Sequence, residues 1–261
     1  MYTVTVAGYN SKHPHPFFMS RPNGNPDYLL LIIKTSTCFL IDGEEISVNP
    51  GSALLVRPNV PYQYRSIDGE FKNDWLHFYC DDPDFPDNSG LLFHQPIPLD
   101  NLGHISRYFE QLMWERSYGL KSCRCQNVDM IMQLLVSNLL QAIEKKDSAL
   151  PYSPYSSKLQ NLRLTMQSQA YKNFTPAELA ASLDVSPSYF QHLYKEFFGI
   201  PFKTDLINMR IEYAKDLISN TNLKLEQIAL MSGYSSEIHF YRQFRQKTRM
   251  TPREYLLHAK R

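Results

Sequence analysis

The sequence predicts an α+β chain of two domains, in which a β-barrel or sandwich followed by helices precedes an all-α domain. Residues 1–99 contain short apolar runs separated by turn residues, which is typical of all-β domains. The last hundred residues contain one helical pattern twice, 50 residues apart, and a repeat at such a period indicates a repeated structural unit. Charge also differs, because residues 158–261 contain 15 Lys and Arg against 9 Asp and Glu, whereas the preceding part contains 12 against 17.

The N-terminal strands are expected where β-branched, leucine and aromatic residues lie between turns. Asp42-Gly43 is a hairpin signal, and Asn49-Pro50-Gly51 marks another turn. The strands expected on this basis are residues 28–34, 38–41, 52–57, 62–66 and 75–80. Many short strands of this kind predict a barrel or sandwich.

Two helices, 102–118 and 128–146, are expected to complete the N-terminal domain. Ile131, Leu135 and Leu139 recur at helical spacing in the second helix, which indicates a face that packs on the barrel. Residues 148–157 contain two prolines and no apolar period, which is typical of a linker. The expected domains are therefore 1–147 and 158–261, with the barrel at about 1–99 and the helices at about 100–146.

The repeat in the C-terminal domain predicts two helix-turn-helix units in tandem. Phe190 corresponds to Phe240, and Tyr194 to Phe244. Thr175-Pro176-Ala177-Glu178 has the pattern of a capping box with proline at the first helical position. A short helix, a turn and a second helix place the second helix in the DNA major groove. A helix at 202–219 is expected to connect the units and to hold the recognition helices about one DNA turn, ~34 Å, apart.

The C-terminal pattern resembles that of the AraC/XylS family of bacterial transcription regulators. The matching positions include Leu179-Ala180, Gly199, Phe202, Arg210, Ala214, Ile228-Ala229, Gly233-Tyr234, Phe240, Arg242, Phe244, Thr251-Pro252 and Tyr255. Two positions depart from the family, since Arg249 stands where glycine is usual and Leu256 where a basic residue is usual. Asp42-Gly43, Pro50-Gly51, Arg57-Pro58 and residues 74–78 are similar, more loosely, to the cupin-like effector domain of the same family.

Helical phase indicates which side chains of the recognition helices face DNA. Phe190, Leu193 and Tyr194 are expected inside, as are Phe240 and Phe244. The expected DNA contacts are Ser188, Gln191, His192, Lys195, Glu237, Ile238, Tyr241, Arg242 and Arg245. Gln and Arg can make bidentate contacts with bases, and Glu can accept from cytosine. Lys195 and Arg245, one turn further along, are expected to contact phosphates.

An effector site is expected on one face of the strand at 75–80. Residues two apart in a strand point the same way, so Trp75, His77 and Tyr79 share a face, with Tyr64 on the preceding strand. Aromatic faces with a few polar groups suit a small polar ligand such as a sugar. In the alternative, Leu76 and Phe78 face inward and the aromatic side chains cover the outside.

Catalysis, metals and cofactors are not expected. A cupin metal site needs histidines and a carboxylate at one place, but Leu31, Ile32 and Ile33 occupy the strand and Tyr62 follows Pro61. His13-Pro14-His15 is read as an N-terminal arm, and Cys123-Arg124-Cys125 has no neighbouring His or Cys cluster. The cysteines show no disulfide framework, and no secretion signal or membrane-spanning run is apparent, so a cytoplasmic protein is expected.

The expected function is a DNA-binding transcription regulator, an activator of carbohydrate-use genes that responds to a small effector. The alternative is a regulator whose N-terminal domain only dimerises or binds protein partners. The partners considered are double-stranded DNA, a sugar or other small polar effector, RNA polymerase and a second copy of the chain. The resemblance implies the dimer contact, which is expected on the helices after the barrel.

Overall fold

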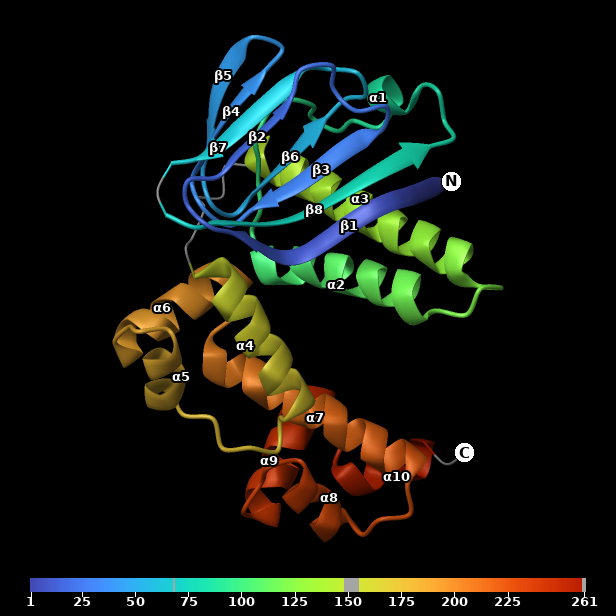
Figure 1. The fold of residues 1–261 in the computed structure, drawn as a ribbon. Coiled ribbons are helices and arrows are strands. Elements are labelled where there is room, and N and C mark those ends of the chain that lie inside the picture. The colour runs from blue at the N-terminus through green and yellow to red at the C-terminus, as the bar shows by residue number, and fades with distance from the viewer. Residues whose placement is uncertain (68, 148–154, 260–261) are drawn as a thin grey trace. The chain divides into compact units, whose positions relative to one another are not determined.

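The computed structural model describes residues 1–67, 69–147 and 155–259 of the 261-residue chain. The chain forms two compact units, Met1–Tyr152 and Ser153–Arg261. Strands followed by helices make up the first unit, and helices the described part of the second (Figure 1). The predicted α+β class is confirmed. Most of the linker expected at 148–157 lies outside the described residues.

Two antiparallel sheets form the β part of the N-terminal unit. The five-stranded sheet has the order β1-β8-β3-β6-β9, and the four-stranded sheet has the order β2-β7-β4-β5. The strands are β1 (Tyr2–His13), β2 (Phe18–Arg21), β3 (Tyr28–Ile33), β4 (Thr37–Ile41), β5 (Glu44–Val48), β6 (Ser52–Val56), β7 (Tyr62–Ser66), β8 (Phe71–Cys80) and β9 (Ile97–Pro98).

The strands expected at 28–34, 38–41, 52–57 and 62–66 are confirmed with small differences at their ends, and β8 begins before the expected residue 75. The N-terminal arm is a correction, because residues up to His13 form the edge strand β1, which pairs with β8. His13 stacks on Phe17 and Phe71, with ring centroids 4.3 Å and 5.8 Å away. Its ring therefore packs against the sheet.

Strand β3 separates two hydrophobic cores, and every residue in it is buried. Leu29, Leu31 and Ile33 belong to the core between the sheets. Leu30 and Ile32 belong to a second core that includes residues of the following helices. Burial on both faces explains why this strand is a continuous apolar run and does not alternate.

Helices α2 (Leu102–Tyr118) and α3 (Arg124–Asp147) pack on the outer face of the five-stranded sheet (Figure 1). Phe109, Leu112 and Leu139 are fully buried in this second core. The short helix α1 (Phe85–Asn88) contributes Phe85 to the same core. The helix expected at 102–118 is confirmed, and the next one begins earlier than the expected residue 128.

The C-terminal unit contains two four-helix cores that share one helix. Its helices are α4 (Ser156–Ser168), α5 (Pro176–Ser182), α6 (Pro187–Phe198), α7 (Phe202–Asn220), α8 (Leu225–Met231), α9 (Glu237–Thr248) and α10 (Pro252–Ala259). Phe202 and Leu206 of α7 lie in the first core, and Ala214 and Ile218 in the second. No helix in the described residues has the length and apolar composition that a bilayer span requires.

Local capping fixes where these helices begin and end. Thr175 and Glu178 form the expected capping box at α5. Ser186 caps α6 and Ser236 caps α9, by accepting from a backbone N–H three residues later. Gly199 and Arg249 end these helices with φ of 71° and 67°. Arg249 therefore ends α9 in the same left-handed conformation in which Gly199 ends α6. This conformation is less favourable for arginine than for glycine, because arginine has a Cβ.

Candidate nucleic-acid interface and effector pocket

Helix α6 exposes the side chains that the sequence assigns to DNA. Its capping residue Ser186 starts the helix in a turn, and Phe190 and Tyr194 anchor it with no exposed surface. The opposite face is open to solvent, and Ser188, Gln191, His192 and Lys195 are all exposed on it. Such a polar, partly basic face at the start of the second helix is the arrangement that reads a major groove.

A buried polar network fixes α6 to its neighbours. Tyr194 on α6 donates its hydroxyl to Asp205 on α7 at 2.7 Å. Arg163 on α4 donates to both oxygens of the same carboxylate, at 2.8 Å and 3.3 Å. Burial raises the pKa of Asp205, but the hydrogen bonds from Arg163 and Tyr194 and the arginine charge together hold this pKa below its usual value. The recognition helix is thus held by directional bonds as well as by apolar packing.

Helix α9 has a similar exposed face, with one correction. Glu237, Ile238, Arg242 and Arg245 are exposed, Ile238 to 84%. Tyr241 is only half-buried and does not face outward as expected. Its phase places it at the edge of the buried face, where it packs against the core around Phe240, and this burial raises its pKa.

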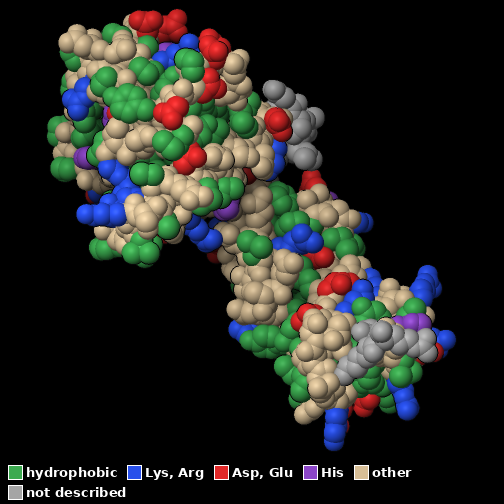
Figure 2. All heavy atoms as spheres, turned by 90° about the vertical axis from the view of Figure 1, so that its right-hand side faces the viewer, with side chains coloured by type: hydrophobic (Ala, Val, Ile, Leu, Met, Phe, Trp, Pro, Cys, Tyr) green, Lys and Arg blue, Asp and Glu red, His purple; other side chains and the backbone are tan. Residues whose placement is uncertain are grey.

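The charge of the helical unit suits an anionic partner. Lys and Arg side chains project from this unit in Figure 2, in agreement with the excess of basic residues in 158–261. Arg242 and Arg245 lie one turn apart on the exposed face of α9. Lys195 lies on α6 at the position that corresponds to Arg245 in the repeat. Lys and Arg contacts with phosphates supply most of the affinity of such a surface for DNA.

A cavity of about 110 Å³ lies against the inner face of the sheets in the N-terminal unit, Met1–Tyr152, called the β unit below. Its apolar lining consists of Phe17, Met19, Leu29, Tyr62, Tyr64 and Trp75. Its polar lining consists of His13, Arg21, Asn73 and His77. The volume is below that of sites for drug-sized molecules, ~300–1,000 Å³, and therefore suits a small ligand.

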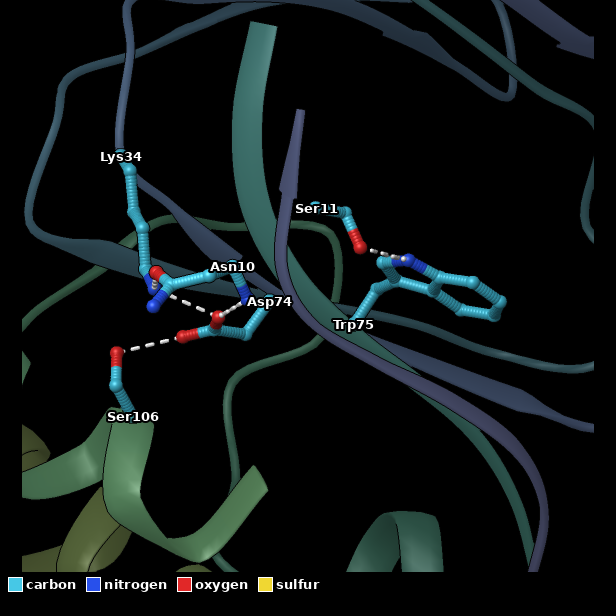
Figure 3. A network of polar contacts seen from close by, with 6 residues as sticks. All are labelled: Asn10, Ser11, Lys34, Asp74, Trp75 and Ser106. Atoms are coloured by element: carbon cyan, nitrogen blue, oxygen red, sulfur yellow. Dashed lines mark hydrogen bonds and ion pairs between the residues drawn. The ribbon is translucent and has the colours of Figure 1, made fainter. Parts of the chain in front are cut away.

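The sequence left open whether Trp75 and His77 or Leu76 and Phe78 of strand β8 face the inside of the β part. Leu76 and Phe78 pack in the core beneath α2 and α3, whereas Trp75 and His77 line the cavity. The Trp75 indole donates to Ser11 on β1 at 3.0 Å (Figure 3). Gly8 permits this approach, because a Cβ there would lie 2.3 Å from the indole nitrogen.

Tyr79 does not line the cavity, although it shares the strand face with Trp75 and His77. It lies beyond the first residue of β3, where β8 pairs only with Thr3 of β1. The opposing sheet does not cover this end of the strand, and Tyr79 is 42% exposed. Three of the four expected effector residues, Tyr64, Trp75 and His77, therefore come together at the cavity.

Hydrogen bonds orient the polar side chains at the cavity. His77 Nδ1 lies 2.8 Å from Asp27 Oδ1, and Thr5 donates to the other oxygen of that carboxylate. Because a carboxylate oxygen accepts, Nδ1 is the donor in this contact. Asn25 donates to the Tyr62 hydroxyl at 2.6 Å. Burial raises the pKa of Tyr62 and of Tyr64, so both hydroxyls stay protonated.

Asn73 is a cavity residue that the sequence interpretation missed. It is 1% exposed, and its Oδ1 is buried without a hydrogen-bond partner. A buried acceptor left unpaired costs ~1–3 kcal/mol, and a donor group in the cavity would remove that cost. The signal was present, because Asn73 lies two residues before Trp75 and hence on the same strand face.

Metal ligands do not gather at either site. Within 1–67, 69–147 and 155–259, no group of three or more His, Cys, Asp or Glu side chains could hold a metal ion. Cys38, Cys80, Cys123 and Cys125 are free, and the last two are exposed.

The comparisons with known proteins agree with the geometry of the helical unit. A model of the family described as "Helix-turn-helix domain" matches residues 179–258. The chain is 26% identical over 255 residues to the arabinose operon regulatory protein of Escherichia coli K12, covering 92% of this chain and 83% of that protein. The same-named protein of Salmonella typhimurium LT2 is also 26% identical over 255 residues, covering 92% of this chain and 86% of that protein. Residues 179–258 are an AraC-type helix-turn-helix domain, and the chain is similar to the two arabinose operon regulators over most of its length.

Among solved structures, the C-terminal domain of AraT, a response regulator from Geobacillus stearothermophilus, is 28% identical. It covers 40% of this chain and 87% of that domain, with a TM-score of 0.38. The matching family model and the two arabinose operon regulators confirm the resemblance that the sequence suggested, and this chain is a DNA-binding transcription regulator.

Proposed function

We propose that this AraC/XylS-family protein regulates transcription in response to a small hydroxylated effector, a sugar in the first instance, which binds in the cavity of the β unit. The observation that carries the proposal is the pairing of Trp75 with the unpartnered acceptor of Asn73 in one cavity. A sugar offers C–H faces that pack on an aromatic ring and hydroxyl groups that donate to buried acceptors. The names of the arabinose operon regulators are consistent with this class of ligand.

On the DNA side, we assign base contacts to Ser188, Gln191, His192, Glu237, Ile238 and Arg242, and phosphate contacts to Lys195 and Arg245. All eight side chains are exposed on one face of α6 or α9. Ile238 has no polar group, so it suits the methyl group of thymine.

The effector assignment is tested by a thermal-shift screen of the full-length protein against neutral monosaccharides and polyols. A compound that stabilises the protein is then titrated while Trp75 fluorescence is followed, with Trp114→Phe removing the other tryptophan. Asn73→Ala should weaken binding of this compound by ~10-fold or more, because a hydrogen bond in a buried site is lost. Tyr79→Ala is the matched control on the same strand face, outside the cavity, and should leave binding unchanged.

A ligand controls a regulator only if it binds two arrangements of the protein with different affinity. His77→Ala should therefore abolish the response of operator binding to the compound and leave ligand-independent operator binding nearly intact. An unchanged response in both Asn73→Ala and His77→Ala would remove the cavity from consideration as the effector site.

A second candidate function, dimerisation without an effector, is favoured by exposed apolar side chains on α2 and α3. Trp114 is 52% exposed and Tyr118 75% exposed on α2, and Met130 and Leu134 are about half exposed on α3. Exposed apolar groups of this size are typical of an interface, and we infer that a second copy of the chain covers them. Sedimentation of Leu134→Glu tests this, since an unchanged dimer would place the interface elsewhere.

A further inference from the structure

The two helix-turn-helix units meet where the turn of the second unit touches the loop before α5. Gly233 lies in that turn with φ of 83°. A Cβ at this position would lie 2.8 Å from the carbonyl oxygen of Tyr171 and 3.0 Å from Nε of Arg210. The units approach each other so closely that no side chain fits between them.

Arg210, on the shared helix α7, connects the two units at this contact. Its Nε donates to the carbonyl oxygen of Ala170 and its Nη2 to that of Lys172, both at 2.9 Å. Its guanidinium carbon lies 5.7 Å from the centre of the Tyr234 ring, which belongs to the second unit. The planar guanidinium makes both hydrogen bonds and the ring contact at once, and a lysine ammonium cannot reproduce that geometry.

Tyr234 continues the connection to the second recognition helix. It is 4% exposed, and its hydroxyl donates to Gln243 on α9 at 3.0 Å. Its ring also lies 5.3 Å from that of Phe240, the buried anchor of the same helix. Burial raises the pKa of Tyr234 to about 12, so the hydroxyl remains a donor.

We propose that Arg210 sets the offset between the two recognition helices and thereby the number of base pairs that must separate their two contacts in the operator. This inference rests on the proposed function, in which α6 and α9 enter successive major grooves. Apolar packing around α7 is non-directional, whereas the bonds of Arg210 fix how one unit is turned relative to the other. Each added base pair moves the second contact by ~3.4 Å and rotates it by ~34°, so a fixed pair of helices accepts one spacing.

The test measures a spacing penalty. Full-length wild-type protein first selects its operator from a random duplex DNA library, and derivatives with one base pair inserted or deleted between the two contacts are then made. The penalty is the ratio of Kd for a derivative to Kd for the selected duplex, measured by fluorescence anisotropy. We expect ~10-fold or more for the wild type, since at least one base contact is lost. For Arg210→Lys we expect less than ~3-fold, because the second unit can turn to follow its site.

Arg163→Lys is the matched control. Arg163 also uses Nε and Nη2, and its guanidinium carbon lies 4.9 Å from the Phe198 ring. Its hydrogen-bond partner Asp205 is on the part of α7 that packs in the first helix-turn-helix core, between Phe202 and Leu206. Its spacing penalty should equal that of the wild type even where its stability falls. A penalty reduced equally in both variants would mean that general loosening is the cause, and it would overturn the proposal.

Tyr234→Phe is a milder second variant, which keeps the ring and loses the bond to Gln243. We expect its penalty to lie between those of the wild type and Arg210→Lys, and it decides the matter alone if Arg210→Lys does not fold by circular dichroism. The proposal is overturned if folded Arg210→Lys and Tyr234→Phe show the same spacing penalty as the wild type. It is also overturned if the wild type binds DNA with one inserted base pair as tightly as the selected duplex. Failure of the wild type to select any duplex would instead refute the proposed function.

Discussion

Replacing Asp205 with alanine should destabilise the helical unit strongly and leave the β unit unchanged. Asp205 is 4% exposed and accepts from Tyr194 and twice from Arg163. Its removal leaves the Tyr194 hydroxyl buried without a partner, at a cost of ~1–3 kcal/mol. Breaking a fully buried ion pair costs ~3–5 kcal/mol, but the Arg163 side chain is 43% exposed and can turn to water. We therefore expect a loss of ~3 kcal/mol in the free energy of unfolding.

Urea unfolding of the full-length protein can separate the two units. Both tryptophans, Trp75 and Trp114, lie in the β unit, so tryptophan fluorescence follows that unit alone, whereas far-UV circular dichroism also follows the helical unit. With an m-value of ~1–3 kcal/mol/M, the helical transition of Asp205→Ala should move ~1–3 M lower. Tyr194→Phe, which loses one hydrogen bond, should cost only ~1 kcal/mol.

The same network predicts how stability depends on pH. The pKa of Asp205 is lower in the folded protein than its ordinary value, so the unfolded state binds the proton more readily. The contribution of Asp205 is complete above the unfolded pKa of ~4 and is lost as pH falls towards the folded pKa. The difference in the free energy of unfolding between the wild type and Asp205→Ala should thus become smaller below about pH 4. A difference under ~1 kcal/mol at pH 7, or a shifted fluorescence transition, would refute the reasoning.

Three further outcomes are expected. A fragment of residues 158–261 should bind the operator selected by the full protein, more weakly because dimer contacts are lost, and a gel shift showing no binding would mean that the unit is not autonomous. Gln191→Ala and Arg242→Ala should each lose ~1–3 kcal/mol of binding free energy and relax the preference for one base of the operator. Lys195→Ala should instead weaken binding to all DNA sequences alike and make the affinity depend less steeply on salt. Selection from a randomised operator library distinguishes the two effects, and unchanged base preferences in Gln191→Ala and Arg242→Ala would contradict the assignment. Arg249→Gly should stabilise the helical unit by ~1 kcal/mol, because φ of 67° suits glycine, and a loss in urea unfolding would show that the Arg249 side chain makes a compensating contact.

The helical unit could be predicted closely because its signals are local. The capping box at Thr175, the cap at Ser186 and the stop at Gly199 each depend on neighbours within one turn. Helical phase then separates Phe190 from His192 without knowledge of any other element. Tyr241 shows the limit of this reasoning, because phase locates the boundary of a buried face only to within one residue.

The β unit was harder to predict, since its contacts join distant residues. Alternation correctly grouped Trp75, His77 and Tyr79 on one face. It could not show that β3 begins opposite Phe78, so that no residue of β3 pairs with Tyr79. Nor could it show that β1 pairs with β8 at the edge of the sheet. Pairings between residues from 58 to 78 positions apart leave no pattern within either strand, which is why the sequence places His13 in an N-terminal arm and not at the end of β1.

Asp74 and Trp75 show how much of the site depends on such distant pairings. Asp74 is fully buried and accepts from Lys34, from Ser106 on α2 and from the backbone of Asn10 on β1 (Figure 3). These partners compensate a buried charge that would otherwise be very costly. The next residues on both strands, Trp75 and Ser11, bond to each other on the cavity side. Because the same two strand segments hold the carboxylate beneath α2 and the indole at the cavity, the position of Trp75 is set by a network outside the cavity as well as by the residues that line it.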